Sequence, residues 1–262
     1  PLVNIEIKMR RRTILALLSM AACSVAACAP QTSMAPAPKS AAGLAPLGPC
    51  PPSSWKPEAP PPTASAKTSM VLLAVGEWAR FGRQVVTYST TAPPRTEQLG
   101  VKERDAPERI TDYWRAVDKS GRSGLTDIPW SAAFISWDIA SAGVPRNLFC
   151  PSQTHTIYVE RMIERARQPG AVFIPHPPAS RPPEVGDLIC ASRNGSGTTL
   201  SNLNRGAGHC DIVVEIRPHE AHAIGGNVGD SITRSVFPLD GGGFLSPISA
   251  RPVFTVIENR LP

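Results

Sequence analysis

Apolar residues recur every three to four positions in four segments, a spacing typical of helices that pack on a core. The predicted helices cover residues 71–81 and 109–117, a segment that begins at 131, and residues 154–168. From residue 187 the apolar runs shorten and alternate with turn residues, as in strands. The predicted strands cover residues 187–191, 210–216, 222–226, 231–237 and 252–257. This order indicates an α+β fold whose N-terminal helices pack on one antiparallel sheet.

The most apolar helix begins at Ser131, directly after a Pro-Trp pair, and Gly143 stands where a helix end needs a residue tolerant of positive φ. Its apolar positions lie on several faces, so we expect protein to enclose it. Ser131 fits an ordinary helix cap. It also fits a nucleophile, because free N–H groups and the positive dipole end gather there. Trp130 fits a core residue or the edge of a groove.

The N-terminal residues 1–28 have the composition of a secretory signal. Three arginines follow Met9, and a short apolar run follows them. Residues 1–8 precede the expected start. The run ends in Val-Ala-Ala-Cys28, which resembles a lipobox, with Cys23 as a weaker candidate. We therefore expect acylation of Cys28 and anchoring in the outer membrane, facing the periplasm. A signal peptide that leaves a soluble protein is the alternative.

Residues 29–67 contain 11 prolines and almost no apolar bulk. Such a composition predicts a disordered, semi-stiff tether, because it cannot bury enough surface to fold. Trp55 is the exception and is a candidate for docking on the folded part. The folded unit is expected over residues 68–262, a length that supports one full core.

The formal net charge is +6 for 262 residues, and the signal segment supplies about half of it. No cluster of Lys and Arg with interleaved aromatic residues is present, which argues against nucleic-acid binding. A weakly basic surface is compatible with an anionic cell wall. The spacing of Cys and His matches no metal site, so we expect neither metal nor cofactor.

Four cysteines remain after the signal segment, and an exported protein permits disulfides between them. Four cysteines allow three pairings. Cys190 and Cys210 lie near the ends of two predicted strands, so a bridge between these strands is the first choice.

Three polar residues occur in an order that suits acyl transfer. Ser131 begins the enclosed helix, His209 begins a strand, and Asn227 ends the next strand. Such a set places a nucleophile, a general base and a residue that orients the base in sequence. His209 would accept the proton of Ser131, Asn227 would hold the imidazole, and backbone N–H groups would stabilise the oxyanion.

The motifs around these residues resemble CHAP and NlpC-type cell-wall amidases and peptidases of the papain-like clan. Pro-Trp-Ser-Ala-Ala-Phe-Ile-Ser-Trp resembles their nucleophile helix, Gly-Asp-Leu-Ile a strand, Gly-His-x-x-Ile-Val-Val-Glu their His strand, and Gly-Gly-Asn the strand of the third polar residue. Over roughly residues 68–260 the chain is most similar to the bacterial domain of unknown function 2272. The resemblance implies a papain-like fold and hydrolysis of peptidoglycan peptides.

The clan uses Cys where this chain has Ser131. A thiol forms a thiolate easily beside an imidazole, whereas a hydroxyl must lose its proton during attack. The chain is therefore a Ser-His variant, a protein whose thiol comes from Cys150 or Cys190, or a protein without catalysis. His155 is a candidate for lining the cleft or for a structural role. Asp211 and Asp230 fit orienting residues or turn residues.

Three functions follow as hypotheses. The first is an envelope lipoprotein whose Ser131, His209 and Asn227 cleave amide bonds in peptidoglycan. The second is a pseudoenzyme that binds the cell wall or an envelope partner without turnover. The third is a serine esterase or acyltransferase, although the chain lacks a Gly-x-Ser-x-Gly elbow.

Overall fold

The computed structural model describes residues 47–57, 64–193, 195–203 and 207–262. The chain divides into two units, 1–37 and 38–262, and only the second contains described residues. The expected signal segment, Cys28 and most of the expected tether lie outside the described residues. Within the described part, no helix has the length and apolar character needed to cross a bilayer.

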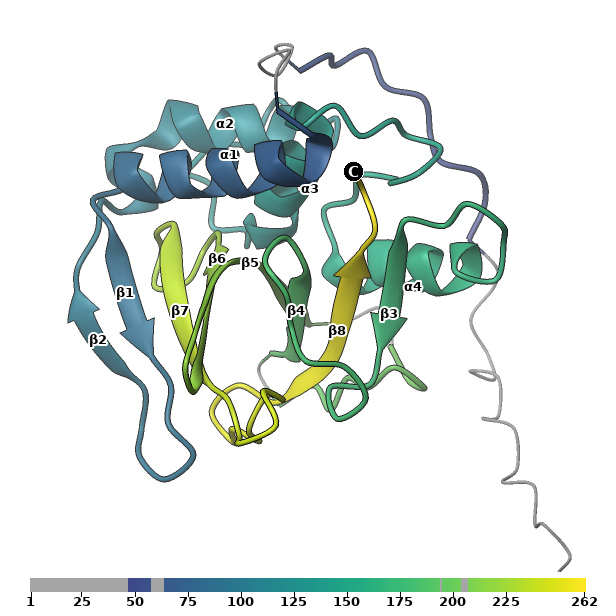
Figure 1. Ribbon diagram of the computed structural model, residues 1–262. Helices are drawn as coiled ribbons and strands as arrows, with labels where there is room; N and C mark the ends of the chain where they lie inside the picture. Colours follow the sequence, from purple (N-terminus) through teal and green to yellow (C-terminus); the bar gives the residue numbers. More distant parts are fainter. Residues whose placement is uncertain (1–46, 58–63, 194, 204–206) are drawn as a thin grey trace, which may run out of the picture. The chain divides into compact units, whose positions relative to one another are not determined.

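Four α-helices occur in the described residues, close to the segments that the apolar spacing predicted (Figure 1). They are α1 (Ala66–Arg80), α2 (Pro107–Arg115), α3 (Ser131–Ser141) and α4 (His155–Arg165), and a short 3-10 helix, η1, covers Glu103–Asp105. Helix α1 begins earlier than predicted because Ser65 caps it, accepting a hydrogen bond from the Thr68 N–H.

In the described part of the chain, eight strands form one sheet in the order β2-β1-β7-β6-β5-β4-β8-β3. The strands are β1 (Gln84–Thr87), β2 (Arg95–Gln98), β3 (Phe173–His176), β4 (Leu188–Ser192), β5 (Gly208–Arg217), β6 (Glu220–Gly225), β7 (Thr233–Pro238) and β8 (Val253–Asn259). The expectation of an α+β fold is confirmed. The expectation of a wholly antiparallel sheet is wrong at one position, because β1 pairs in parallel with β7.

The sequence pattern missed β1, β2 and β3. Each of these strands has only four residues, too few for a clear alternation. All four residues of β2 are exposed, so no apolar face marks it. Strand β3 contains Pro175, which cannot donate to a ladder and is tolerated here at the sheet edge.

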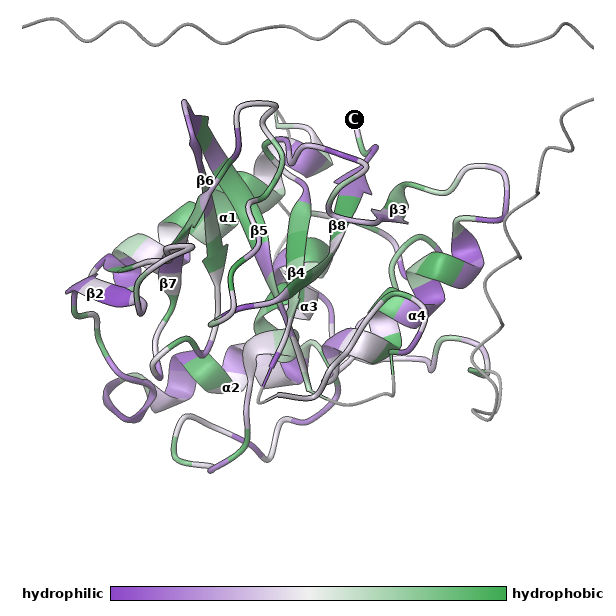
Figure 2. Ribbon diagram, turned by 90° about the horizontal axis from the view of Figure 1, so that it is seen from below, coloured by the Kyte–Doolittle hydropathy of each residue, from purple (hydrophilic) through white to green (hydrophobic). Residues whose placement is uncertain are grey.

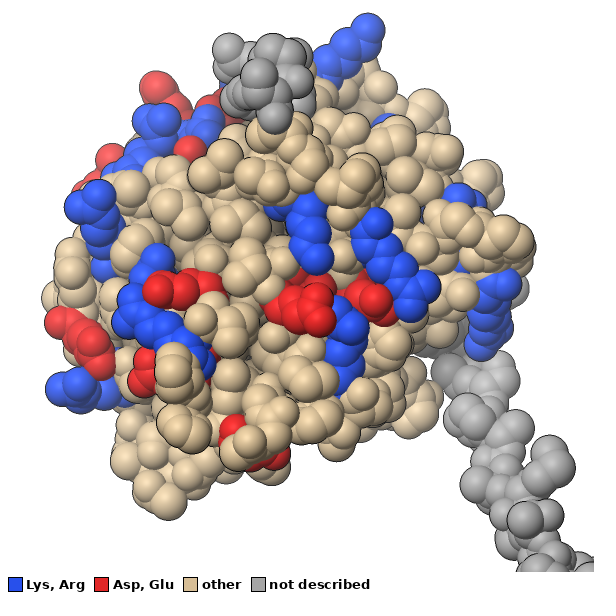
Figure 3. All heavy atoms as spheres, in the orientation of Figure 1, with Lys and Arg blue, Asp and Glu red and all other residues tan. Residues whose placement is uncertain are grey.

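The sheet has an apolar core on each face. Successive side chains of a strand point to opposite faces, and Ile212 and Ile224 belong to the core that α1 and α3 cover. Val213 and Ala223 belong to a second core on the opposite face. Figure 2 shows apolar residues concentrated along β4 and β5, the strands at the centre of this arrangement. On the face shown in Figure 3, acidic and basic side chains are interspersed.

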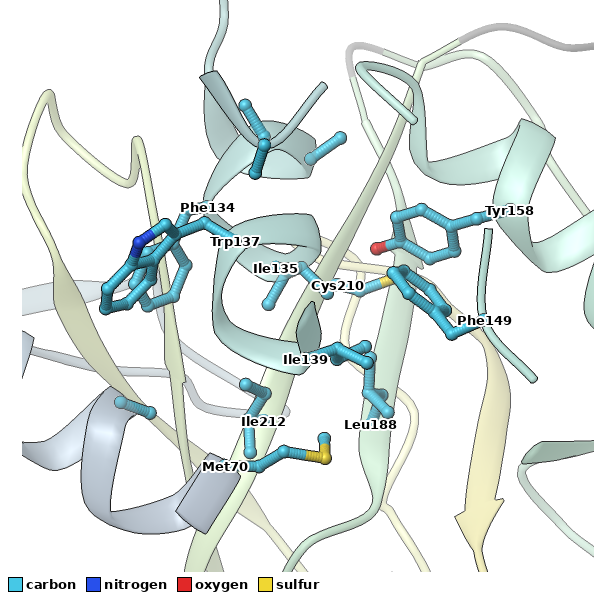
Figure 4. Close-up of a cluster of buried hydrophobic side chains, with 14 of the residues drawn as sticks. Met70, Phe134, Ile135, Trp137, Ile139, Phe149, Tyr158, Leu188, Cys210 and Ile212 are labelled. Carbon is cyan, nitrogen blue, oxygen red and sulfur yellow. The ribbon is translucent and has the colours of Figure 1, made fainter. Parts of the chain in front are cut away.

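Helix α3 is enclosed, as its apolar pattern predicted. All of its residues except Ala140 are buried, and Figure 4 shows Ile135 and Ile139 beside the strands that carry Cys210 and Leu188. Asp138 lies among these apolar groups, and neither of its carboxylate oxygens has a hydrogen-bond partner among the described residues. A helix packed on all sides positions its first residue rigidly.

Part of the expected tether, residues 47–57, is attached to the domain. A disulfide joins Cys50 to Cys150, and Arg161 and Arg146 donate hydrogen bonds to the carbonyls of Gly48 and Pro51. Trp55 is partly buried against the core, which is the docking that its apolar side chain suggested. Residues 47–57 are therefore attached to the folded unit.

Candidate functional site

Two helix N-termini meet at the candidate site. Ser131 is the first residue of α3, His155 is the first residue of α4, and the Ser131 Oγ is hydrogen-bonded to the His155 Nε2. Ser131 is 2% exposed and His155 is 4% exposed. The structure thus pairs the candidate nucleophile with an imidazole at the position where the N–H groups of α3 converge.

Tyr158 contacts the second nitrogen of the His155 ring. Its hydroxyl is hydrogen-bonded to the His155 Nδ1, one turn further along α4. Burial, followed by the electrostatic effects of His209, Arg193 and Arg251, holds the pKa of His155 well below its ordinary range. The imidazole is therefore neutral at neutral pH. In the tautomer whose proton is on Nδ1, directed at Tyr158, the Nε2 lone pair accepts a hydrogen bond from the Ser131 hydroxyl.

His209 lies next to His155 rather than next to Ser131. The two imidazole ring centroids are 5.3 Å apart, with the ring planes 41° from each other. His209 Nε2 is 3.1 Å from Asp211 Oδ1. Burial and the charge of Arg251 lower the pKa of His209 to about 4, despite the opposing effect of Asp211. His209 is therefore a second neutral imidazole.

The predicted pairing of Ser131 with His209 is replaced by a pairing with His155. No hydrogen bond joins Ser131 to His209 in the described part of the chain. The reason lies in strand β5, where Cys210 and Ile212 belong to the core beneath α3. His209 and Asp211 alternate with these residues, so they take the other face of the strand.

Asp211 forms a buried ion pair with Arg251, which lies in the loop between β7 and β8. An Arg251 N–H donates to Asp211 Oδ2, and another donates to the Tyr88 hydroxyl at 2.6 Å and to Ser235 Oγ at 3.1 Å. Although burial alone raises the pKa of Asp211, the charges of Arg251 and His209 bring it below its ordinary value. Asp211 is therefore an ionised partner of His209 and not a turn residue.

Asn227 does not orient His209. It follows β6 with a φ of 59°, and its Nδ2 donates to Glu103 Oε2 at 3.0 Å. The Trp130 Nε1 donates to the same oxygen at 2.5 Å. Trp130 is fully buried and belongs to the core. Asn227 therefore ties the end of β6 to η1 and, through Glu103, to the start of α3.

Two glycines at the end of β6, Gly225 and Gly226, allow this strand to approach β5 and the start of α3. A Cβ at Gly225 would lie 2.0 Å from Asp211 Oδ1 and 2.8 Å from His209 Nε2, and a Cβ at Gly226 would lie 2.6 Å from the Trp130 ring. The Gly-Gly-Asn motif therefore provides space for the imidazole and carboxylate. Asp230 lies beyond it, exposed and with a φ of 58°, which makes it a turn residue.

A polar cavity of about 230 Å³ opens on the His209 side of this site. Its lining residues include His209, Asn227 and two arginines, Arg193 and Arg251. Ser131 is not among its lining residues. The full lining is Tyr88, Ser192, Arg193, His209, Asn227, Val228, Gly229, Ala250 and Arg251.

All cysteines in the described residues form disulfides. Cys190 and Cys210 stand directly opposite each other on β4 and β5 and are joined, the pair that the strand pattern favoured. Cys150 is joined to Cys50. Cys190 and Cys150 therefore have no free thiol that could act as the nucleophile in place of Ser131. Within the described chain no cluster of three His, Cys, Asp or Glu residues has the geometry of a metal site.

The sequence reasoning missed Tyr158, Arg193, Arg251 and Glu103 as members of the site. The spacing of His155 and Tyr158 on a predicted helix was a usable signal, because residues three apart share a face. Arg251 carried no such signal, since its partner Asp211 is 40 residues away in the chain.

Comparison with known proteins identifies one family. Residues 100–256 match the family described as uncharacterized protein conserved in bacteria (DUF2272). The matched region contains Ser131, His155, His209 and Arg251, and begins after α1. Neither the curated proteins nor the solved structures contain a match to the chain. The match covers more than half of the chain, which therefore belongs to the bacterial DUF2272 family.

Proposed function

We propose that this domain is a serine hydrolase of acyl bonds, in which Ser131 is the nucleophile and His155 is the general base. One observation carries the proposal, namely the hydrogen bond between Ser131 Oγ and His155 Nε2 at the N-terminus of α3. The role of base thus moves from His209 to His155. Tyr158 takes the place of the third residue, because it holds the His155 Nδ1.

The surroundings of Ser131 suit this chemistry. A serine hydroxyl must give up its proton as it attacks a carbonyl carbon, and a neutral imidazole accepts it. His155 then returns the proton to the leaving group. No side chain caps α3 at Trp130, so N–H groups of the first turn are available to the developing oxyanion. His209, packed against His155 and bonded to Asp211, is a positioning residue in this scheme.

The proposed substrates are amide bonds of cell-wall peptides. The order of the Trp-Ser helix, the Gly-Asp-Leu strand and the His strand supports a papain-like relationship, in which Ser131 replaces a Cys. The same proposal includes export and a lipid anchor at Cys28 in the outer membrane. Two disulfides in the described residues support an oxidising compartment.

A second candidate is a domain that binds the cell wall without turnover. Its support is the burial of Ser131 and the position of the polar cavity, which His209 lines and Ser131 does not. In that case the Ser131–His155–Tyr158 chain holds the two helix ends together. A serine esterase or acyltransferase uses the same groups as the first candidate and differs only in substrate.

The test uses the purified full chain with isolated cell wall, followed by mass spectrometry of released products. Ser131→Ala and His155→Gln should each lower product release by about 10³-fold or more. Ser141→Ala, a buried serine at the other end of α3, is the matched control and should leave release unchanged. A fluorophosphonate should label Ser131 in the parent protein and not in His155→Gln.

The outcomes separate the candidates. Equal product release by the parent and Ser131→Ala contradicts the hydrolase. Absence of both turnover and labelling, with cell wall still sedimenting the protein, selects the binding domain. Labelling of Ser131 with turnover of ester probes alone selects the esterase.

A further inference from the structure

The polar cavity beside His209 contains more positive than negative charge. Arg251 is matched by Asp211, with which it forms a buried ion pair. Arg193 is partly buried and donates only to neutral oxygens, the Asn227 carbonyl at 3.3 Å and the Asn227 Oδ1 at 3.4 Å. No carboxylate among the described residues lies within ion-pair distance of Arg193. Asp230, the other acid near it, is exposed.

The neighbouring groups do not remove this excess charge. His209 is neutral, and an arginine keeps its charge in proteins. Burial and the charge of Arg251 lower the pKa of Arg193, and the charges of Asp230 and Asp211 only partly oppose this shift. The Tyr88 hydroxyl accepts from Arg251 at 2.6 Å and has its own proton to donate. Charged and neutral donors therefore surround a cavity of about 230 Å³.

We propose that this cavity binds a carboxylate of a peptide, held by Arg193 with Tyr88 as a further donor. A guanidinium presents parallel N–H groups that match a carboxylate in planar, bidentate geometry. The volume accommodates a carboxylate together with a small side chain but not an extended polymer. The ligand class is thus a short peptide with a free carboxylate.

The link to substrate recognition rests on the proposed function. His209 lines the cavity and packs against His155, and His155 is hydrogen-bonded to Ser131. A carboxylate in the cavity would therefore be separated from the nucleophile by the His209 and His155 rings. Under the proposed function, this arrangement suits peptides whose free carboxylate lies at a distance from the bond that reacts.

Binding is tested without turnover, using the full chain with Ser131→Ala and calorimetric titration. The probes are acetyl-alanyl-alanine with a free carboxylate, the same peptide as its C-terminal amide, and inorganic phosphate. The free acid should bind about tenfold or more tightly than the amide, because a charge-assisted pair contributes at least about 1.5 kcal/mol. Adding Arg193→Gln should abolish this preference. Arg167→Gln, an exposed arginine outside the cavity, should preserve it.

Several results would overturn the carboxylate site. These are equal binding of acid and amide, an Arg193→Gln protein that keeps the preference, tighter binding of phosphate than of the acid, and no binding of any probe. The protein can bind the free-acid peptide more tightly than the amide even if it releases no products from cell wall. Turnover that persists without this preference removes only the carboxylate site, so the two proposals fail separately.

Discussion

The guanidinium of Arg251 donates a hydrogen bond to Asp211 Oδ2, and both residues are buried. This contact holds the carboxylate whose other oxygen bonds the His209 imidazole. The loop between β7 and β8 thereby positions a group on β5. The same ion pair thus contacts both the cavity, which Arg251 lines, and His209, which Asp211 bonds.

Removing one member of the Asp211–Arg251 ion pair should destabilise the folded protein. Asp211→Ala leaves the Arg251 charge buried without its counter-ion, and we expect a loss of about 3–5 kcal/mol in the free energy of unfolding. Urea denaturation of the purified protein measures this loss. Glu97→Gln, which disrupts the exposed pair with Arg95, is the control and should change stability far less. An Asp211→Ala protein as stable as the parent would show that Arg251 is not held by this carboxylate.

Gly225 should not accept a side chain. A Cβ there would overlap Asp211 Oδ1 and press on His209 Nε2, so Gly225→Ala should destabilise the protein by about 1–3 kcal/mol. Gly76→Ala offers a matched comparison, because a Cβ in that exposed part of α1 meets nothing within 4 Å. It should stabilise the protein by up to about 1 kcal/mol. Thermal unfolding followed by circular dichroism compares the two variants. Changes in stability of the same sign in both variants would contradict this prediction.

Asp138 should make stability depend on pH. Burial, followed by the charge of Glu77, raises the pKa of Asp138 well above its ordinary range. A raised folded-state pKa means that its contribution is fully present below the ordinary value near 4. That contribution is lost as pH rises through the folded-state value, by up to about 1.4 kcal/mol per pH unit.

Asp138→Asn removes this titration, so its stability advantage over the parent should grow from pH 5 to pH 8. Urea denaturation at several pH values measures the difference. Asp105→Asn, at an exposed position, should show no such trend. A constant difference between Asp138→Asn and the parent would indicate that the carboxyl does not titrate differently in the folded protein.

The Cys50–Cys150 disulfide should hold residues 47–57 on the domain. With Cys50→Ser and Cys150→Ser together, the segment can detach without global unfolding. Chymotryptic cleavage after Trp55 should then accelerate roughly tenfold or more, since a disulfide typically contributes about 2–4 kcal/mol. Mass spectrometry of the fragments measures this rate, and the melting temperature serves as the control for the rest of the domain. An unchanged cleavage rate would mean that the contacts of Trp55 hold residues 47–57 on the domain without the disulfide.

Much of the fold was predictable because it depends on local patterns. The apolar spacing placed α2, α3 and α4, and the short apolar runs placed β4 to β8, since each segment has to bury one side. The order of helices and strands predicted the fold class for the same reason. Cys190 and Cys210 were predictable as a pair from their positions at strand ends.

The sequence by itself determined the chemical groups of the site, namely the hydroxyl of Ser131, the imidazoles and the glycines that give them room. Only the tertiary structure decided which imidazole meets the hydroxyl. That choice depends on which face of β5 lies beneath α3, and a shift of one residue reverses it. Cys210 lies on the side of β5 that faces α3. His209 therefore lies on the other side, with Asp211 and its partner Arg251. The imidazole that is hydrogen-bonded to Ser131 is that of His155, from another helix. Such long-range pairings leave no periodic signal along the chain.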